Sequence, residues 1–283
     1  MITEEKIREL KLISNEIRIW AIKMIYNAQS GHPGGSLSAA DILSALYFHV
    51  LRIDPKNPAW EDRDRFVLSK GHASAAYYAA LALRGFFPVD ELMTFRKIGS
   101  RLQGHPTIHL PGVDMTTGSL GQGFSAAIGM AISGKIYGKD YRVYALIGDG
   151  EINEGISWEA ALSAPHHKLD NLTVILDRNR YQLDGATEEI LSLENVEEKF
   201  RAFNWEVFTV DGHNIKEILL TLEKAREIKG KPSMIVARTV KGKGVSFMEN
   251  TSKYHGKAPN KEEFEKAIRE LEEQRKNILE GKE

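Results

Sequence analysis

The stretch GDGEINEGISWEAALSAPHHKLDNLTVILDRNRYQLDG, residues 148–185, places an acid in one turn and an amide in the next. Apolar runs precede the two turns, at Val143–Ile147 and Leu172–Leu176, and a helical segment separates them. Short apolar runs joined by one helix are typical of buried parallel strands connected by a right-handed crossover. The stretch therefore predicts a strand–helix–strand unit in which Asp149 and Asn179 follow the carboxyl ends of two strands.

The same alternation continues along the chain. Further apolar runs occur at Trp205–Val210 and Met234–Ala237, and helices are predicted near Ile156–Ala164, Val196–Phe203 and Ile215–Ile228. Strands and helices that alternate at this spacing favour an α/β fold with a doubly wound, mainly parallel sheet flanked by helices. Ligands bind such sheets outside the carboxyl ends of the strands.

The N-terminal part has a different pattern. Apolar residues at three- and four-residue steps predict a long helix over residues 4–29, and the turn-rich segment Gln29–Gly35 should end it. The other features are a helix near Ala39–Leu51, a short apolar run at Phe66–Leu68, a helix to about Arg84, a loop-rich segment at 99–123, a helix over Phe124–Tyr137 and a charged helix over 260–280. We expect residues 1–283 to form one domain with an N-terminal helical elaboration and a C-terminal surface helix.

The composition excludes several classes of protein. Lys and Arg number 38 against 39 Asp and Glu, without a long block of one sign, so a nucleic acid partner is not favoured. The lack of cysteine excludes disulfides, thiolate catalysis and thiolate metal sites. No apolar run reaches the roughly eighteen residues of a membrane span, and the charged N-terminus is unlike an export signal. We expect a cytoplasmic protein with no membrane partner.

Asp149 and Asn179 are candidate metal ligands. Gly148 and Gly150 allow a sharp turn at the acid and leave room for a ligand to approach. One carboxylate, one amide and a backbone carbonyl are too few oxygens for a calcium cage, but they suit Mg²⁺, which takes further ligands from phosphates and water. An isolated Gly-Asp-Gly is usually an ordinary turn. The two strand contexts instead favour a metal-bridged diphosphate site.

The stretch also resembles a known motif. GDG, 28 further residues and Asn179 resemble the thiamine-diphosphate-binding motif, with Arg180 in place of its usual second Asn. SGHPGGSLS at 30–38, DRFVLSKGHAS at 64–74, GHP at 104–106 and TTGSLGQG at 116–123 extend the resemblance to the diphosphate-binding domain of transketolases. These matches occur in order between about residues 14 and 260.

The resemblance implies a cofactor site. Asp149, Asn179 and the main-chain carbonyl of Tyr181 would ligate Mg²⁺, or Ca²⁺ or Mn²⁺ in its place. The segment Gly118, Ser119 and Leu120 would lie against the aminopyrimidine ring of thiamine diphosphate, although the family commonly has Pro where Ser119 stands. The residues expected to bind the cofactor are His72, Gly118, Ser119, Leu120, Gly148, Asp149, Gly150, Glu154, Asn179 and His255.

Four histidines in turn-rich segments are candidate catalytic residues. The resemblance implies that His72 and His255 contact the diphosphate or the substrate, that His105 binds oxygens of the donor, and that His32 handles protons at the cleaving bond. Imidazole suits these roles because it can donate to a developing oxyanion near neutral pH. A single loop histidine is otherwise usually a surface or capping residue, and the match around His255 is shorter than the others.

Further residues are open to more than one interpretation. Glu154 matches a family glutamate that lies at a dimer interface and couples two cofactor sites, but it could also compensate a helix dipole. The loop Lys241–Gly244 could face a phosphate, although loop lysines are usually solvated. The remaining histidines are interpreted as structural or exposed: His49, His109, His166, His167 and His213.

The resemblance also implies a partner. In the family, the glutamate that activates the cofactor belongs to a pyrimidine-binding domain, which we expect on a separate C-terminal transketolase subunit. Family active sites form between chains, so we expect an α2β2 heterotetramer and no activity from this chain alone. The expected reaction is transfer of a two-carbon ketol unit from a ketose phosphate to an aldose phosphate, as in the pentose phosphate pathway.

Two alternatives remain open. The first is another thiamine enzyme, such as the α subunit of a 2-oxo acid dehydrogenase or a relative of deoxyxylulose-phosphate synthase. A 2-oxo acid, however, lacks the sugar hydroxyls for which His32, His72 and His105 make sense. The second is a non-catalytic, regulatory module that binds thiamine diphosphate. The presence of Asp149, Asn179 and the four histidines counts against it.

Overall fold

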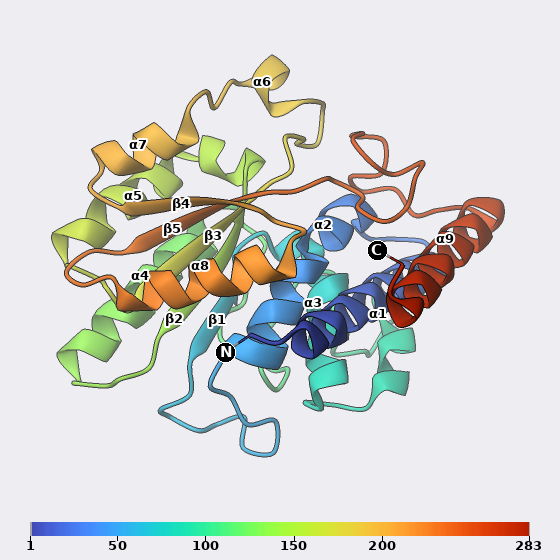
Figure 1. Ribbon diagram of the computed structural model, residues 1–283, viewed down its shortest axis with the longest axis horizontal. Helices are drawn as coiled ribbons and strands as arrows, with labels where there is room; N and C mark the ends of the chain where they lie inside the picture. The colour runs from blue at the N-terminus through green and yellow to red at the C-terminus, as the bar shows by residue number, and fades with distance from the viewer. Residues whose placement is uncertain (1, 283) are drawn as a thin grey trace.

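The computed structural model describes residues 2–282, and its centre is a parallel sheet with helices on both faces (Figure 1). The strands lie side by side in the order β1-β2-β3-β5-β4, and every neighbouring pair is parallel. Their bounds are Arg65–Leu68 for β1, Val143–Gly148 for β2, Leu172–Arg178 for β3, Glu206–Asp211 for β4 and Ser233–Arg238 for β5. The predicted doubly wound α/β class is confirmed.

The helices divide between the two faces of the sheet. One face carries α1 (Glu4–Ala28), α2 (Pro33–Ala45), α3 (Ser74–Arg84) and α8 (Ile215–Glu227). The other carries α4 (Gln122–Ile136), α5 (Gly155–His166) and α7 (Val196–Ala202). The short helix α6 (Thr187–Ile190) follows β3, and α9 (Lys261–Glu280) packs along α1 through Ala267 and Leu271.

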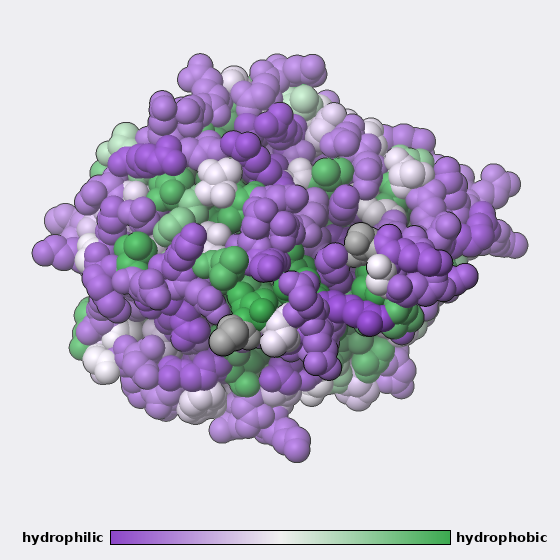
Figure 2. All heavy atoms as spheres, in the orientation of Figure 1, coloured by the Kyte–Doolittle hydropathy of each residue, from purple (hydrophilic) through white to green (hydrophobic). Residues whose placement is uncertain are grey.

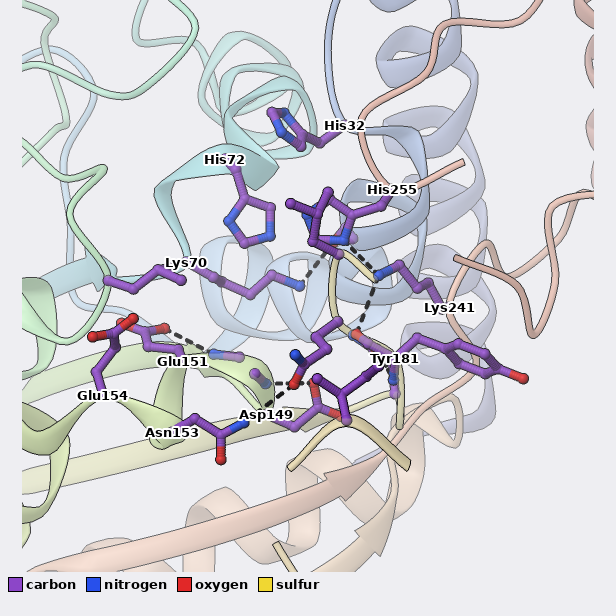
Figure 3. A pocket seen from close by; sticks show the side chains of 18 of the residues that line it. His32, Lys70, His72, Asp149, Glu151, Asn153, Glu154, Tyr181, Lys241 and His255 are labelled. Atoms are coloured by element: carbon purple, nitrogen blue, oxygen red, sulfur yellow. Dashed lines mark hydrogen bonds between the residues drawn. The ribbon is translucent and has the colours of Figure 1, made fainter. Parts of the chain in front are cut away.

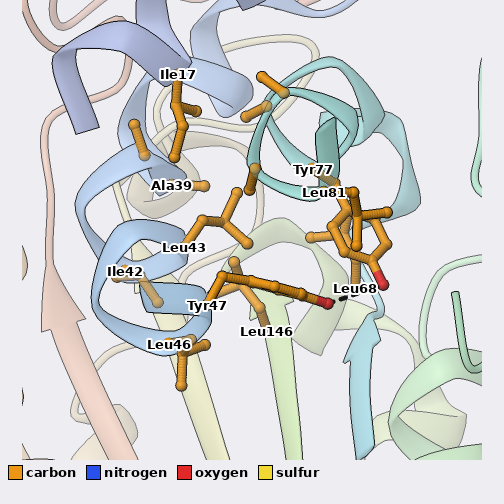
Figure 4. Packing of buried hydrophobic residues seen from close by; sticks show 14 of the residues in the cluster. Ile17, Ala39, Ile42, Leu43, Leu46, Tyr47, Leu68, Tyr77, Leu81 and Leu146 are labelled. Carbon is orange, nitrogen blue, oxygen red and sulfur yellow. Dashed lines mark hydrogen bonds between the residues drawn. The ribbon is translucent and has the colours of Figure 1, made fainter. Parts of the chain in front are cut away.

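The two faces hold separate apolar cores because side chains alternate along each strand. In β2, Tyr144 and Leu146 pack with α1, α2 and α3, whereas Val143 and Ala145 pack with α4 and α5. Figure 4 shows the first core, where the hydroxyl of Tyr47 lies 3.1 Å from that of Tyr77. The face of the molecule in Figure 2 is mostly hydrophilic, with apolar residues in small groups.

Two expectations about local structure were wrong. Helix α2 begins at Pro33, not near Ala39, because proline is well suited to the first helical position. The glycine that follows also serves packing, since a Cβ at Gly34 would lie 3.0 Å from Cγ of Lys241. In addition, the apolar run at Trp205–Val210 predicts a buried strand, but β4, at one edge of the sheet, is only partly buried.

The order of the strands in the sheet determines where the functional motifs lie. Strands β2 and β3 are neighbours, and Gly148 is in register with Asp177. Asp149 and Asn179 therefore emerge at the same edge of the sheet, as the sequence predicts. No helix within residues 2–282 is long and apolar enough to cross a membrane.

Candidate functional site

A cavity of about 610 Å³ lies at the carboxyl ends of β2 and β3 (Figure 3). Its walls come from the starts of α2 and α3, the turns after β2 and β3, and the loop after β5. The predicted site residues that line it are His32, His72, Gly118, Leu120, Gly148, Asp149, Gly150, Glu154, Asn179, Tyr181 and His255. The topology therefore brings segments from the whole chain to one edge of the sheet.

Two predicted residues lie outside this lining. Ser119 is exposed between Gly118 and Leu120. His105 is exposed and lies next to Gly118 in the wall, because a Cβ added to Gly118 would be 3.3 Å from Cδ2 of His105. The four histidines are thus close to one cavity, but only three of them line it.

Asp149 is a buried carboxylate that backbone groups hold in place. Its side chain is 2% exposed and accepts hydrogen bonds from the backbone N–H groups of Gly150 and Arg180. Burial and the nearby charge of Asp177 raise its pKa to about 6, although Arg178 acts in the opposite direction. A carboxylate held in this way favours a cation at the cavity, since a cation would stabilise its charged form.

Oxygen atoms from the next turn complete a possible metal site. Asn179 is 5% exposed, and its side-chain oxygen accepts a hydrogen bond of 3.1 Å from the backbone N–H of Tyr181. Within residues 2–282 no group of three or more His, Asp or Glu side chains could hold a metal ion. A divalent ion here would therefore depend on amide, carbonyl and ligand oxygens beside Asp149, which suits Mg²⁺.

His32, His72 and His255 form a triangle on the opposite side of the cavity (Figure 3). Their ring centroids are 5.2 to 5.5 Å apart. Burial lowers the pKa of His32 to about 4, that of His255 to about 3 and that of His72 well below its ordinary value. All three rings are therefore neutral at pH 7, and each can donate one hydrogen bond and accept another.

Two lysines lie between these histidines and Asp149. Lys70 is 1% exposed, forms an ion pair with Asp177 and donates a hydrogen bond of 2.9 Å to the carbonyl of Gly35. Lys241 is 2% exposed, and burial and the charge of Lys70 lower its pKa to about 8. The solvated interpretation of the Lys241 loop was wrong for this residue. Two buried ammonium groups make the cavity a favourable place for an anion.

Lys70 and Glu151 were not predicted from the sequence. The carboxylate of Glu151 is 2% exposed and accepts hydrogen bonds from Ser69 and from the backbone N–H groups of Gly121 and Gly148, the last two at 2.8 and 2.9 Å. It therefore joins the ends of β1 and β2 to the start of α4. The only signal for Glu151 in the sequence was its position directly after Gly-Asp-Gly.

Glu154 is exposed, lies immediately before α5 and makes no capping hydrogen bond. Its role at a dimer interface stays a prediction.

The segment of residues 181–194, here named the flap, forms another wall that the sequence did not predict. Tyr181 and Ala186 make an isolated antiparallel bridge, and α6 follows. Leu183, Ile190 and Leu191 line the cavity and are 64%, 46% and 59% exposed. The flap thus adds apolar surface to the cavity.

The remaining histidines lie outside the cavity lining, as predicted. His213 has a structural position: its Nδ1 lies 2.7 Å from the carboxylate of Asp41, and its Nε2 accepts a hydrogen bond of 2.8 Å from the N–H of Val240. Asp41 also forms a buried ion pair with Arg18. This network connects α1 and α2 to the residue before Lys241.

Comparisons with known proteins agree with this geometry. A family model described as "Transketolase, thiamine diphosphate binding domain" matches residues 9–277. The chain is 47% identical to the 6-deoxy-6-sulfo-D-fructose transketolase subunit SqwG of Clostridium sp. (strain MSTE9), over 94% of this chain and 97% of that protein. It is 42% identical to one of the apulose-4-phosphate transketolase subunits of Phocaeicola vulgatus, over 95% of each chain.

Single-chain transketolases are also similar. The human transketolase is 41% identical over 98% of this chain and 44% of its own length. The crystal structure of Campylobacter jejuni transketolase superposes with a TM-score of 0.88 and 39% identity, over 93% of this chain and 42% of that one. The chain thus spans nearly the whole of the two subunits and less than half of these longer proteins.

Proposed function

The chain belongs to the transketolase family, as a thiamine-diphosphate-binding N-terminal subunit, and on that premise we propose that it transfers a two-carbon ketol unit from a ketose phosphate to an aldose phosphate. The observation that carries the proposal is the cavity itself. It joins a buried carboxylate, two buried ammonium groups and three neutral imidazoles at the edge of the sheet.

The donor set suits a metal-bound diphosphate. Asp149, Asn179 and the carbonyl of Tyr181 would hold Mg²⁺, because they supply hard oxygen atoms but leave places for phosphate oxygens. Lys70 and Lys241 would face the negative charge of the diphosphate. Gly118, Ser119 and Leu120 would lie against the aminopyrimidine ring. When bound, thiamine diphosphate supplies the electron sink that allows the C2–C3 bond of a ketose to break.

The histidines would bind and orient the sugar. The nitrogen Nδ1 of His32 is buried and lacks a hydrogen-bond partner within the described chain, so it is available to a substrate hydroxyl or its proton. Lys241 donates to Nδ1 of His255, which leaves the proton of that ring on Nε2. His105, which is exposed next to Gly118, would bind oxygens of the donor. Glu154 would act at the interface between two copies of the site.

We also propose a second, C-terminal chain as the partner. The two relatives that match this chain over nearly their whole length are named as subunits, and the single-chain enzymes are more than twice as long. The partner would carry the pyrimidine-binding domain and the activating glutamate, in an α2β2 assembly in the cytoplasm. Residues 1–283 would form the single diphosphate-binding domain of that assembly.

The donor sugar is a separate question. The names of the relatives specify 6-deoxy-6-sulfo-D-fructose and apulose 4-phosphate, so modified ketoses belong beside the pentose phosphate sugars as candidate donors. The proposal requires only a ketose whose hydroxyls face His32, His72 and His105.

The test is a ketol-transfer assay with thiamine diphosphate and Mg²⁺. Xylulose 5-phosphate, 6-deoxy-6-sulfo-D-fructose and apulose 4-phosphate serve as donors, and the chain is assayed alone and with the candidate C-terminal subunit. Activity only in the mixture, lost in Asp149→Ala but kept in Asp90→Asn, supports the proposal. Asp90 is exposed and lies outside the cavity. A mixture active on 2-oxo acids and inactive on every ketose contradicts it.

A further inference from the structure

We propose that Arg178 is a positioning residue that fixes the flap over the cavity and thereby strengthens cofactor binding. This inference rests on the proposed function, because it assigns the cavity to a metal-bound cofactor. It concerns the last residue of β3, which immediately precedes Asn179.

One guanidinium group connects three parts of the site. The side chain of Arg178 is 11% exposed. One terminal nitrogen donates to Oγ1 of Thr187 at 2.8 Å and to the carboxylate of Asp149 at 3.4 Å. The other donates to the carboxylate of Glu188. Arg178 thus joins the acid after β2 to the first turn of α6, on the flap.

Glu188 extends this connection to the end of the flap. Its second carboxylate oxygen accepts hydrogen bonds from the hydroxyl of Ser192 and, at 3.2 Å, from the backbone N–H of Glu194. The backbone of Thr187 is also held, because its N–H donates to the carbonyl of Arg180 at 2.9 Å. The ion pair between Arg178 and Glu188 therefore constrains both ends of the segment that contains Ile190 and Leu191.

This constraint has a consequence for binding. Ile190 and Leu191 line the cavity with largely exposed apolar side chains, which a bound organic ligand would cover. A wall that is already ordered loses less conformational entropy when the ligand binds, so an ordered flap increases affinity. A lysine could not replace Arg178, because its single ammonium nitrogen cannot reach Thr187 and Glu188 with two separate nitrogens, as the planar guanidinium does.

Arg178 also has an opposing effect, which makes the proposal testable. A positive charge beside Asp149 disfavours a second cation there. The titration is carried out at pH 8, where the carboxylate of Asp149 is ionised. If Arg178 acted only through Asp149, its removal would then strengthen metal-dependent binding or leave it unchanged. If Arg178 acts through the flap, its removal weakens binding, and so does the loss of Glu188, which makes no contact with Asp149 among the described hydrogen bonds and ion pairs.

The experiment combines hydrogen exchange with a binding titration on the full chain. The variants are Arg178→Met, Arg178→Lys, Glu188→Gln and, as a control, Arg201→Met, which removes an exposed positive charge on α7, outside the cavity lining. Exchange is followed in peptides covering 182–194 and in peptides covering β2 and β3. Thiamine diphosphate is titrated in the presence of Mg²⁺.

We expect all three variants of Arg178 and Glu188 to exchange faster in the flap, with unchanged exchange in β2 and β3. The dissociation constant of thiamine diphosphate should rise about tenfold, as expected for a lost charged hydrogen bond. Arg201→Met should match the original protein in both measurements. Glu188 is 44% exposed, so Glu188→Gln is a variant that tests the flap without disturbing the core.

Two results would overturn the inference. One is unchanged flap exchange in Arg178→Met. The other is weaker binding in Arg178→Met while Glu188→Gln changes neither measurement, which would show that Arg178 does not act through the flap. If neither the chain nor its mixture with the C-terminal subunit binds thiamine diphosphate, the proposed function fails, whereas the exchange data still decide whether Arg178 fixes the flap.

Discussion

The ammonium group of Lys241 donates a hydrogen bond to Nδ1 of His255 at 2.7 Å. The same group donates to the main-chain carbonyl of Tyr181 at 3.1 Å. Lys241 therefore connects the histidine side of the cavity to the turn that carries Asn179. It also fixes which nitrogen of His255 carries the proton, and a buried charge in that position favours an anionic ligand.

Lys241→Met is expected to weaken the binding of thiamine diphosphate by about ten- to a hundredfold, since a charged hydrogen-bond donor is lost. The affinity for thiamine, which lacks the phosphates, should change little. Fluorescence titration of both ligands measures the difference. Lys243→Met, in the same loop, is the matched control. Equal losses for both ligands would mean that Lys241 acts on the fold and not on the diphosphate.

The Mg²⁺-dependent affinity should fall as the pH is lowered through about 6. The carboxylate of Asp149 has a pKa of about 6, and protonation removes the charge that a metal ion needs. The pKa values of His32 and His255, about 4 and 3, keep both rings neutral throughout this range. Titrations between pH 5 and 8 should show a loss of at most about tenfold per pH unit, as for one proton. A transition that persists in Asp149→Asn would assign the proton to another group.

Glu151→Gln should destabilise the protein, because an amide group offers only one acceptor oxygen where the carboxylate accepts hydrogen bonds from three partners. A buried donor left without a partner costs about 1–3 kcal/mol, so the free energy of unfolding should fall by about that amount. Urea denaturation measures it. Glu159→Gln, on the exposed side of α5, is the control and should be neutral. A neutral Glu151→Gln would show that the three segments are held by other contacts.

The residues that the sequence identified correctly are those whose place follows from topology. Asp149 and Asn179 come directly after two neighbouring parallel strands, so the crossover between them is enough to bring them together. The histidines were found through motif resemblance, and the fold confirms that His32, His72 and His255 line one cavity. Their chemical roles, the metal ligands and the contacts of Ser119 and Glu154 stay predictions.

The residues that were missed depend on partners far away in the chain. Lys70 forms an ion pair with Asp177, and Glu151 accepts a hydrogen bond from the N–H of Gly121. No local sequence pattern predicts these contacts. The burial of Lys241 depends on its contact with Gly34 of α2, far away in the chain, so the loop sequence alone could not decide whether Lys241 is buried. The start of α2 was missed for a different reason, since Pro-Gly-Gly usually marks a turn and here forms a first helical turn.

The most direct test of the account is calorimetric titration of the chain with thiamine diphosphate, with and without Mg²⁺. The central claim is that this chain's own oxygen and ammonium groups form the metal-bound diphosphate site. We predict binding that requires Mg²⁺, is abolished in Asp149→Ala and is unchanged in Asp90→Asn. Binding that is equally strong without Mg²⁺, or that survives Asp149→Ala, would contradict the claim.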